Sequence, residues 1–143
     1  MASTEFDPRS LIASSRIGVL ATLRASGMPQ LSPVTTVYDA DDDRILVFMT
    51  AGRAKEANLR RDPRAAIEFT SADGYTWATA EGTATLIGPS TVPDGPEVDA
   101  LVDYYRSGAG EHPDWREYRE VMVADRRVLL VLQITHAYGA KLR

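Results

Sequence analysis

The sequence predicts a mainly β protein, a closed antiparallel barrel with helices at its periphery. Segments rich in β-forming residues follow one another in pairs, and short turns rich in Gly and Asp join them. Strand and helix segments do not alternate as they would in a doubly wound parallel sheet. The chain has 143 residues, of which 44% are hydrophobic, so we expect one domain over residues 1–143 with one core.

Turn signals bound the expected strands. Ser26-Gly27 and Asp73-Gly74 suit tight turns, and Gly88-Pro89 ends the longest β-rich run. The segment 44–50 is apolar on both faces, which is typical of a buried strand. The expected strands are residues 17–23, 31–38, 44–50, 65–71, 75–87 and 128–134.

Three helices are expected beside these strands. Residues 53–61 lack Gly and Pro, are rich in helix formers and end before Asp62-Pro63. Two later segments, separated by Gly108 and Gly110, carry apolar side chains at helical spacing. These side chains are Val98, Leu101, Val102 and Tyr105 in the first segment, and Trp115, Tyr118 and Met122 in the second.

Composition and charge exclude several classes of protein. The formal net charge of -4 argues against a nucleic-acid binder, which needs a basic surface to displace counterions. The chain has no cysteine, which excludes disulfides and thiolate metal sites. The longest apolar run, residues 128–132, is far shorter than a membrane span, and the first residues lack the apolar core of a signal peptide. We expect a cytoplasmic protein with no membrane partner.

The most informative motif is Thr50-Ala51-Gly52-Arg53-Ala54-Lys55, in which a glycine turn joins a strand end to a helix start. A helix N-terminus offers free N–H groups, and arginine and lysine add charged donors, so the motif favours binding of a phosphate group. The alternative is a solvated helix face, since cations in a first helical turn oppose the helix dipole. Five of the 16 basic residues lie in this region: Arg53, Lys55, Arg60, Arg61 and Arg64.

Two further patterns do not indicate a metal site. Asp39-x-Asp41-x-Asp43 is similar to the start of a calcium loop, but Arg44 stands where that loop needs glycine, so we interpret the pattern as a turn. His112 and His136 are far apart, and neither has a second ligand at metal-binding spacing.

Four segments carry a resemblance to a known family. The most specific is residues 53–65, which read RAKEANLRRDPRA. Residues 17–34 contain IGVLATL followed by GMPQLSPV, residues 80–84 read AEGTA, and residues 125–130 read DRRVLL. The match covers nearly the whole chain and resembles the pyridoxamine 5'-phosphate oxidase-like, FMN-binding split-barrel superfamily. Within it, the chain is most similar to the actinobacterial (mycobacterial-type) oxidoreductases that depend on coenzyme F-420, a deazaflavin.

The resemblance implies a split β-barrel of six to seven strands that pairs as a homodimer, with two cofactor sites at the interface. Tyr75 and Trp77, which share one face of an expected strand, would wall the partner's site or simply fill a core or interface. The resemblance implies that the cofactor is bound by Ser32, Pro33, Val34, Thr50, Arg53, Ala54, Lys55, Asn58, Arg60, Arg61, Tyr75, Trp77, His136 and Tyr138.

The function implied by the resemblance is hydride transfer from reduced coenzyme F-420 to a small organic acceptor, with a proton from solvent or from Tyr138. Residues 29–34 lack the basic side chains of the flavin-binding strand in true pyridoxamine phosphate oxidases, which argues against FMN and against vitamin B6 oxidation. Two alternatives stay open: an FMN-dependent oxidase or reductase of the same fold, and a non-catalytic carrier or sensor of F-420.

Overall fold

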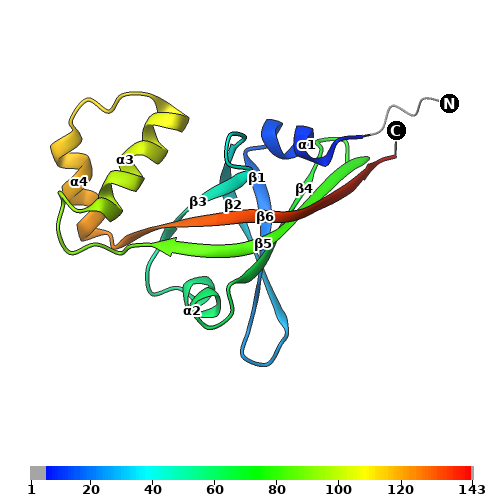
Figure 1. Ribbon diagram of the computed structural model, residues 1–143, viewed down its shortest axis with the longest axis horizontal. Coiled ribbons are helices and arrows are strands. Elements are labelled where there is room, and N and C mark those ends of the chain that lie inside the picture. The colour runs from blue at the N-terminus through cyan, green and yellow to red at the C-terminus, as the bar shows by residue number, and fades with distance from the viewer. Residues whose placement is uncertain (1–5, 143) are drawn as a thin grey trace.

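A computed structural model describes residues 6–142. Its centre is a closed barrel in which neighbouring strands follow the order β1-β2-β3-β6-β5-β4 and every neighbouring pair is antiparallel (Figure 1). The prediction of a mainly β antiparallel barrel with peripheral helices is confirmed, with six strands. The strands are β1 (Ile17–Leu23), β2 (Pro29–Asp39), β3 (Arg44–Thr50), β4 (Arg64–Thr70), β5 (Thr76–Ile87) and β6 (Arg127–Lys141).

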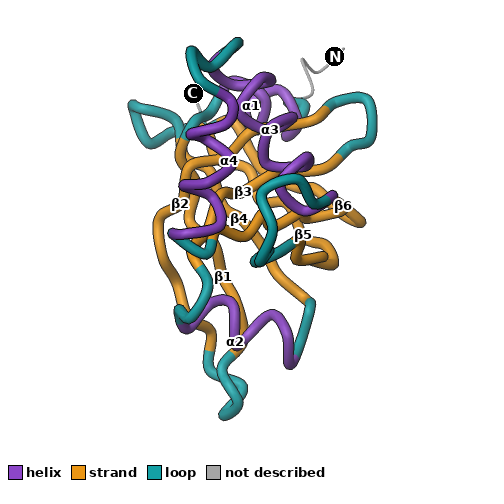
Figure 2. The backbone as a smooth tube through the Cα atoms, turned by 90° about the vertical axis from the view of Figure 1, so that its left-hand side faces the viewer, coloured by secondary structure: helices purple, strands orange, loops and turns teal. Residues whose placement is uncertain are grey.

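The described residues also form four helices around the barrel: α1 (Pro8–Ser14), α2 (Ala54–Arg61), α3 (Pro96–Ala109) and α4 (Trp115–Ala124). Helices α1 and α2 lie on opposite sides of the barrel, while α3 and α4 form a hairpin beside it (Figures 1 and 2). The sequence did not predict α1. Its start does carry a helix signal, because the Asp7 side chain caps the N–H of Arg9 and Pro8 occupies the first helical turn.

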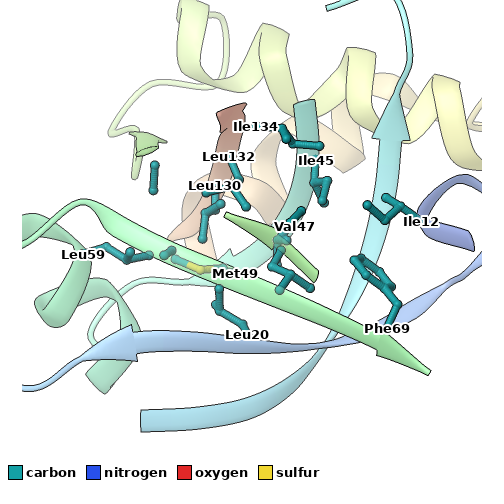
Figure 3. Packing of buried hydrophobic residues seen from close by; sticks show 14 of the residues in the cluster. Ile12, Leu20, Ile45, Val47, Met49, Leu59, Phe69, Leu130, Leu132 and Ile134 are labelled. Atoms are coloured by element: carbon teal, nitrogen blue, oxygen red, sulfur yellow. The ribbon is translucent and has the colours of Figure 1, made fainter. Parts of the chain in front are cut away.

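The apolar side chains form two clusters, one on each face of the sheet. The cluster inside the barrel contains Leu20, Val47 and Leu130, and Ile12 of α1 and Leu59 of α2 enter it from opposite sides (Figure 3). The second cluster lies between the outer face of β3 and β6 and the helical hairpin. Burial on both faces explains why β3 and β6 read as continuous apolar runs in the sequence.

Strand β6 continues beyond the predicted end at residue 134, because it pairs with all of β5. A register shift between Glu81 and Gly82 lets the long β5–β6 ribbon bend. At that point a Cβ on Gly82 would collide with the backbone carbonyl of Gln133, so only glycine fits. The predicted strand and its C-terminal extension are therefore one element.

The acidic turn predicted at residues 39–43 is present, and its last carboxylate anchors α1. Asp43 accepts two hydrogen bonds of 2.8 Å from the Arg9 guanidinium and one of 2.6 Å from the Tyr38 hydroxyl. Within residues 6–142 no group of three or more candidate metal-binding side chains comes together. The same residues contain no helix that is both long and apolar enough to span a membrane.

Candidate functional site

The turn between β3 and α2 places the basic motif. Gly52 has a φ of +85°, a left-handed conformation that glycine adopts without strain. Its N–H donates a 2.7 Å hydrogen bond to Glu56 in the first turn of α2, and this bond lowers the pKa of Glu56. The carboxylate of Glu56 also places a negative charge near the positive end of the helix dipole.

Arg53 and Lys55 follow this turn and stand at the start of α2. Neither side chain forms a hydrogen bond or ion pair with the part of the chain that the structure describes. Arg53 is the residue that precedes the helix, and its side chain does not cap it. The first N–H groups of α2 and two free cations are therefore available to an anion.

A third cation reaches the same place from the other end of the chain. Thr50 at the end of β3 pairs with Arg127 at the start of β6, and the Arg127 guanidinium donates a 2.9 Å hydrogen bond to the Thr50 hydroxyl. The Nε of Arg127 is buried without a hydrogen-bond partner. A buried donor without a partner is costly, so the described residues satisfy Arg127 only in part.

Aromatic side chains form the wall beside Arg127. Its guanidinium carbon lies 4.6 Å from the centre of the Phe48 ring. The Phe48 ring stacks on Tyr104 of α3, with 5.6 Å between ring centres and an angle of 5° between the planes. Burial raises the pKa of Tyr104, so its hydroxyl stays protonated at neutral pH. The helical hairpin thus places a neutral hydroxyl-bearing ring at the edge of the site.

These groups surround a hollow of about 500 Å³, which we call the cation hollow. One side is basic, and the other is formed by the central part of β2, with aromatic and apolar side chains. Its size is typical of small-molecule sites. The hollow is lined by Pro33, Val34, Thr35, Phe48, Met49, Thr50, Arg53, Lys55, Tyr104 and Arg127.

The structure brings five of the sequence-predicted site residues to this hollow: Pro33, Val34, Thr50, Arg53 and Lys55. Two further predicted residues are next to these in the chain but are not part of the lining: Ser32 precedes Pro33, and Ala54 stands between Arg53 and Lys55. Phe48, Tyr104 and Arg127 were not predicted. The contact between Arg127 and Thr50 joins residues 77 positions apart, so no local spacing could have revealed it.

Three predicted residues on α2 have partners within the chain. Asn58 is buried and donates to Thr22 at 3.0 Å and to Gln30 at 2.8 Å. Arg60 pairs with Glu56 at 2.9 Å and donates to a backbone carbonyl. Arg61 donates to the Leu23 carbonyl and to Asn58. Their assignment to the cofactor stays a prediction, and in this structure they connect α2 to the barrel.

The predicted aromatic residues form a separate cluster on β5 and β6. Tyr138 stacks on His136 with 5.4 Å between ring centres and meets Trp77 edge-on at 5.8 Å. Tyr75 is exposed just before β5. Tyr138 lies eleven residues beyond Arg127 on β6, roughly 35 Å along the strand at about 3.3 Å per residue. None of these residues lines the cation hollow of its own chain.

Comparisons with known proteins agree with this architecture. A family profile described as pyridoxamine 5'-phosphate oxidase matches residues 8–140. Among solved structures, the conserved hypothetical protein Rv2991 from Mycobacterium tuberculosis is similar with a TM-score of 0.74 and 24% identity, covering 100% of this chain and 89% of that one. A protein named F-420 reductase has a TM-score of 0.65 and 24% identity, covering 94% of this chain and 98% of that one.

A third similar structure is a pyridoxamine 5'-phosphate oxidase-related, FMN-binding protein from Nostoc punctiforme. Its TM-score is 0.68 and its identity 19%, over 95% of this chain and 78% of that one. At these identities the structural similarities show the fold alone, while the profile covers nearly the whole chain. The resemblance stated from the sequence is confirmed: this chain belongs to the pyridoxamine 5'-phosphate oxidase family and has its flavin-binding split-barrel fold.

Proposed function

We propose that this protein is an oxidoreductase that binds coenzyme F-420 in the cation hollow and uses it to reduce a small organic acceptor. The observation that carries the proposal is the hollow in which Arg53 and Lys55, which have no partners within residues 6–142, stand beside the guanidinium of Arg127. A phosphate group would accept hydrogen bonds from Arg53 and Lys55 and match the positive charge of the hollow.

The residues of the hollow fit a phosphorylated, ring-containing cofactor. Arg53, Lys55 and Arg127 would hold the phosphate, together with the free N–H groups of α2. The wall formed by Pro33, Val34 and Thr35 carries no charge, which suits a flat ring. When bound, the cofactor supplies the hydride, and the protein has to orient it and exclude water.

A homodimer forms part of the proposal. Ile17 and Leu31 are 66% and 64% exposed on the outer face of β1 and β2. Val19 of the same face pairs with Pro33, which lines the hollow, so this apolar face borders the site. A second copy packed here would cover the apolar surface and bring its own aromatic cluster with Tyr138 toward the ring.

Sedimentation of the purified protein tests the dimer, with Leu31→Asp as the disrupting variant. We expect a dimer for the natural sequence and a monomer for the variant, because a buried unpaired carboxylate opposes association. Asp41→Asn, which changes charge away from this face, should remain dimeric. A natural-sequence monomer that binds the cofactor fully would remove Tyr138 and its neighbours from the site.

Two experiments test the activity. Side-by-side fluorescence titrations should give tighter binding of F-420 than of FMN. A screen of small organic acceptors with reduced F-420 should then show turnover, measured as return of the oxidised cofactor's absorbance. Equal or tighter binding of FMN would overturn the F-420 assignment. Tight F-420 binding without any turnover would favour the carrier function.

The second candidate is an FMN-dependent oxidase or reductase. The similarity to the FMN-binding Nostoc protein favours it, and the cations of the hollow suit the phosphate of FMN as well. FMN lacks the oligoglutamate tail of F-420, so a preference between the two must come from residues outside the phosphate site. A purified protein that is yellow with bound FMN would support this candidate.

A further inference from the structure

A second cavity of about 500 Å³ shares Tyr104 with the lining of the cation hollow. Its lining comes from α3, from the β2–β3 hairpin and from β6. Tyr104 lines both spaces, but none of the cations of the hollow and none of the predicted cofactor residues lines this one. We call it the acidic cavity, for the charges at its rim.

The floor of the acidic cavity is apolar. Leu46 of β3 and Leu129 and Val131 of β6 form it, and all three belong to the cluster beneath the helical hairpin. Their backbone groups are already paired, since Leu46 faces Val131 in the β3–β6 register. A ligand on this floor would therefore gain apolar contact and no hydrogen bond.

The rim of the cavity is negatively charged on two sides. Asp103 stands on the face of α3 that Ala100, Tyr104 and Ser107 share at helical spacing, and this face lines the cavity. Asp41, on the β2–β3 turn, also belongs to its lining. Neither carboxylate forms an ion pair with any residue in the described range 6–142.

The single cation of the lining does not neutralise these charges. Arg44 is held by Asp39 at 2.8 Å and also lies 3.7 Å from Asp42. The hydrogen bond from Arg44 lowers the pKa of Asp39, so this pair stays ionised at neutral pH. The charges of Asp41 and Asp103 are left for a ligand to compensate.

We propose that the acidic cavity binds a small organic cation with an apolar body, such as an amine that is protonated at neutral pH. The apolar part would lie on Leu46 and Leu129, and the ammonium group would lie between Asp41 and Asp103. An anion would be repelled by this rim. The apolar floor also disfavours a bare metal ion, which needs several oxygen ligands. This proposal is independent of the cofactor in the cation hollow.

The test uses 4-phenylbutylamine, which is cationic at pH 7, beside its neutral and anionic analogues 4-phenylbutanol and 4-phenylbutyrate. Amide NMR titrations of the full chain give each dissociation constant and map the binding place. We expect the amine to bind about five- to tenfold more tightly than the alcohol, the gain from two exposed ion pairs. The shifted amides should belong to α3 and to residues 37–46, and the carboxylate should bind most weakly.

Substitutions test whether the carboxylates of the rim cause the preference for the amine over the alcohol. Asp41→Asn combined with Asp103→Asn should bring the amine to the affinity of the alcohol, and both substitutions are at exposed positions that should leave the fold intact. Glu120→Gln, on the exposed face of α4, is the control for a lost negative charge and should keep the preference. Equal binding of amine and alcohol by the natural sequence, or an undiminished preference in the double variant, would overturn the proposal. Amide chemical-shift changes confined to other surfaces of the protein would also overturn it.

Discussion

Both ends of α2 carry basic side chains, but the two ends differ in whether these side chains have partners within the described residues. At the C-terminal end, Arg60 and Arg61 have partners within the chain, and just beyond the helix Arg64, the first residue of β4, pairs with Asp62 at 2.7 Å. The hydrogen bonds from Arg64 lower the pKa of Asp62 to about 2. At the N-terminal end, Arg53 and Lys55 have no such partners and oppose the helix dipole. We interpret the unpaired cations, which stand in an electrostatically unfavourable position, as ligand-binding residues. We interpret the cations with partners in the chain as residues that stabilise the fold.

The largest effect should follow from removing the free cations. Arg53→Ala and Lys55→Ala should each weaken F-420 binding about ten- to a hundredfold, the scale of a charge-assisted hydrogen bond of about 1.5 to 3 kcal/mol. Tm should stay the same or rise slightly, because neither side chain has a partner to lose. Fluorescence titration and thermal melts measure the two quantities. Unchanged affinity in both variants would make this end of α2 an ordinary solvated surface.

Arg127 extends the comparison to a half-buried cation that is only partly paired, because it donates to Thr50 while its Nε has no partner within residues 6–142. Arg127→Met keeps an unbranched side chain against Phe48 but removes the charge and the unpartnered Nε. We expect F-420 binding to weaken about tenfold, with only a small loss of stability, because the lost hydrogen bond to Thr50 is offset by removal of a buried donor without a partner. Calorimetric titration and urea unfolding test this together. A variant that unfolds easily but binds normally would assign Arg127 to the fold alone.

The paired cations should contribute less to F-420 affinity than the unpaired ones, and their contribution should depend on the salt concentration. If Arg60, Arg61 and Arg64 meet the carboxylates of the F-420 tail, each alanine substitution should reduce F-420 affinity by about threefold or less at low salt. FMN, which has no tail, should be unaffected. The effect should fade as salt rises, because exposed charges are screened. A tenfold loss from one of these substitutions would contradict the division of α2 into binding and structural ends.

The smallest effect concerns the ion pair that fixes α1. The Arg9 guanidinium holds the pKa of Asp43 below its ordinary value of 3.8. Such a carboxylate stabilises the fold above its unfolded pKa, and the contribution is lost as pH falls through the lowered folded pKa. Asp43→Asn should therefore reduce Tm by about 1 to 3 °C at pH 7, since this pair is partly exposed. The difference from the natural sequence should vanish once the pH lies below the lowered pKa of Asp43, and a difference that stays constant as the pH falls would contradict this role of the ion pair.

Short sequence patterns were sufficient to predict most of the strands of the barrel and the basic side of the site. Gly27 and Gly74 take positive φ angles in the turns expected from Ser26-Gly27 and Asp73-Gly74. The basic motif after β3 does border a hollow, because strand end, glycine turn and helix start are consecutive in the chain. Helix α1 was missed because a seven-residue segment with one buried side chain, Ile12, has too little periodicity to detect.

The remainder of the site depends on contacts between distant segments. Arg127 reaches Thr50 only because β6 pairs with β3, and the sequence does not encode that pairing as a spacing. Tyr104 was expected on a helix, but its stacking on Phe48 follows from how the hairpin of α3 and α4 packs on the sheet. The aromatic residues on β5 and β6 do not line the hollow of their own chain, so their part in the site depends on the proposed dimer.

The most direct test of the division between free and paired cations is the ¹H–¹⁵N NMR spectrum of the arginine Nε–H groups, recorded while F-420 is added. We expect the Arg53 and Arg127 signals to shift downfield as these groups form hydrogen bonds to phosphate. The Arg64 signal should not move, because its guanidinium is already paired with Asp62. Inorganic phosphate at higher concentration should move the same two signals. Shifts of Arg64 with Arg53 and Arg127 unmoved would contradict the account.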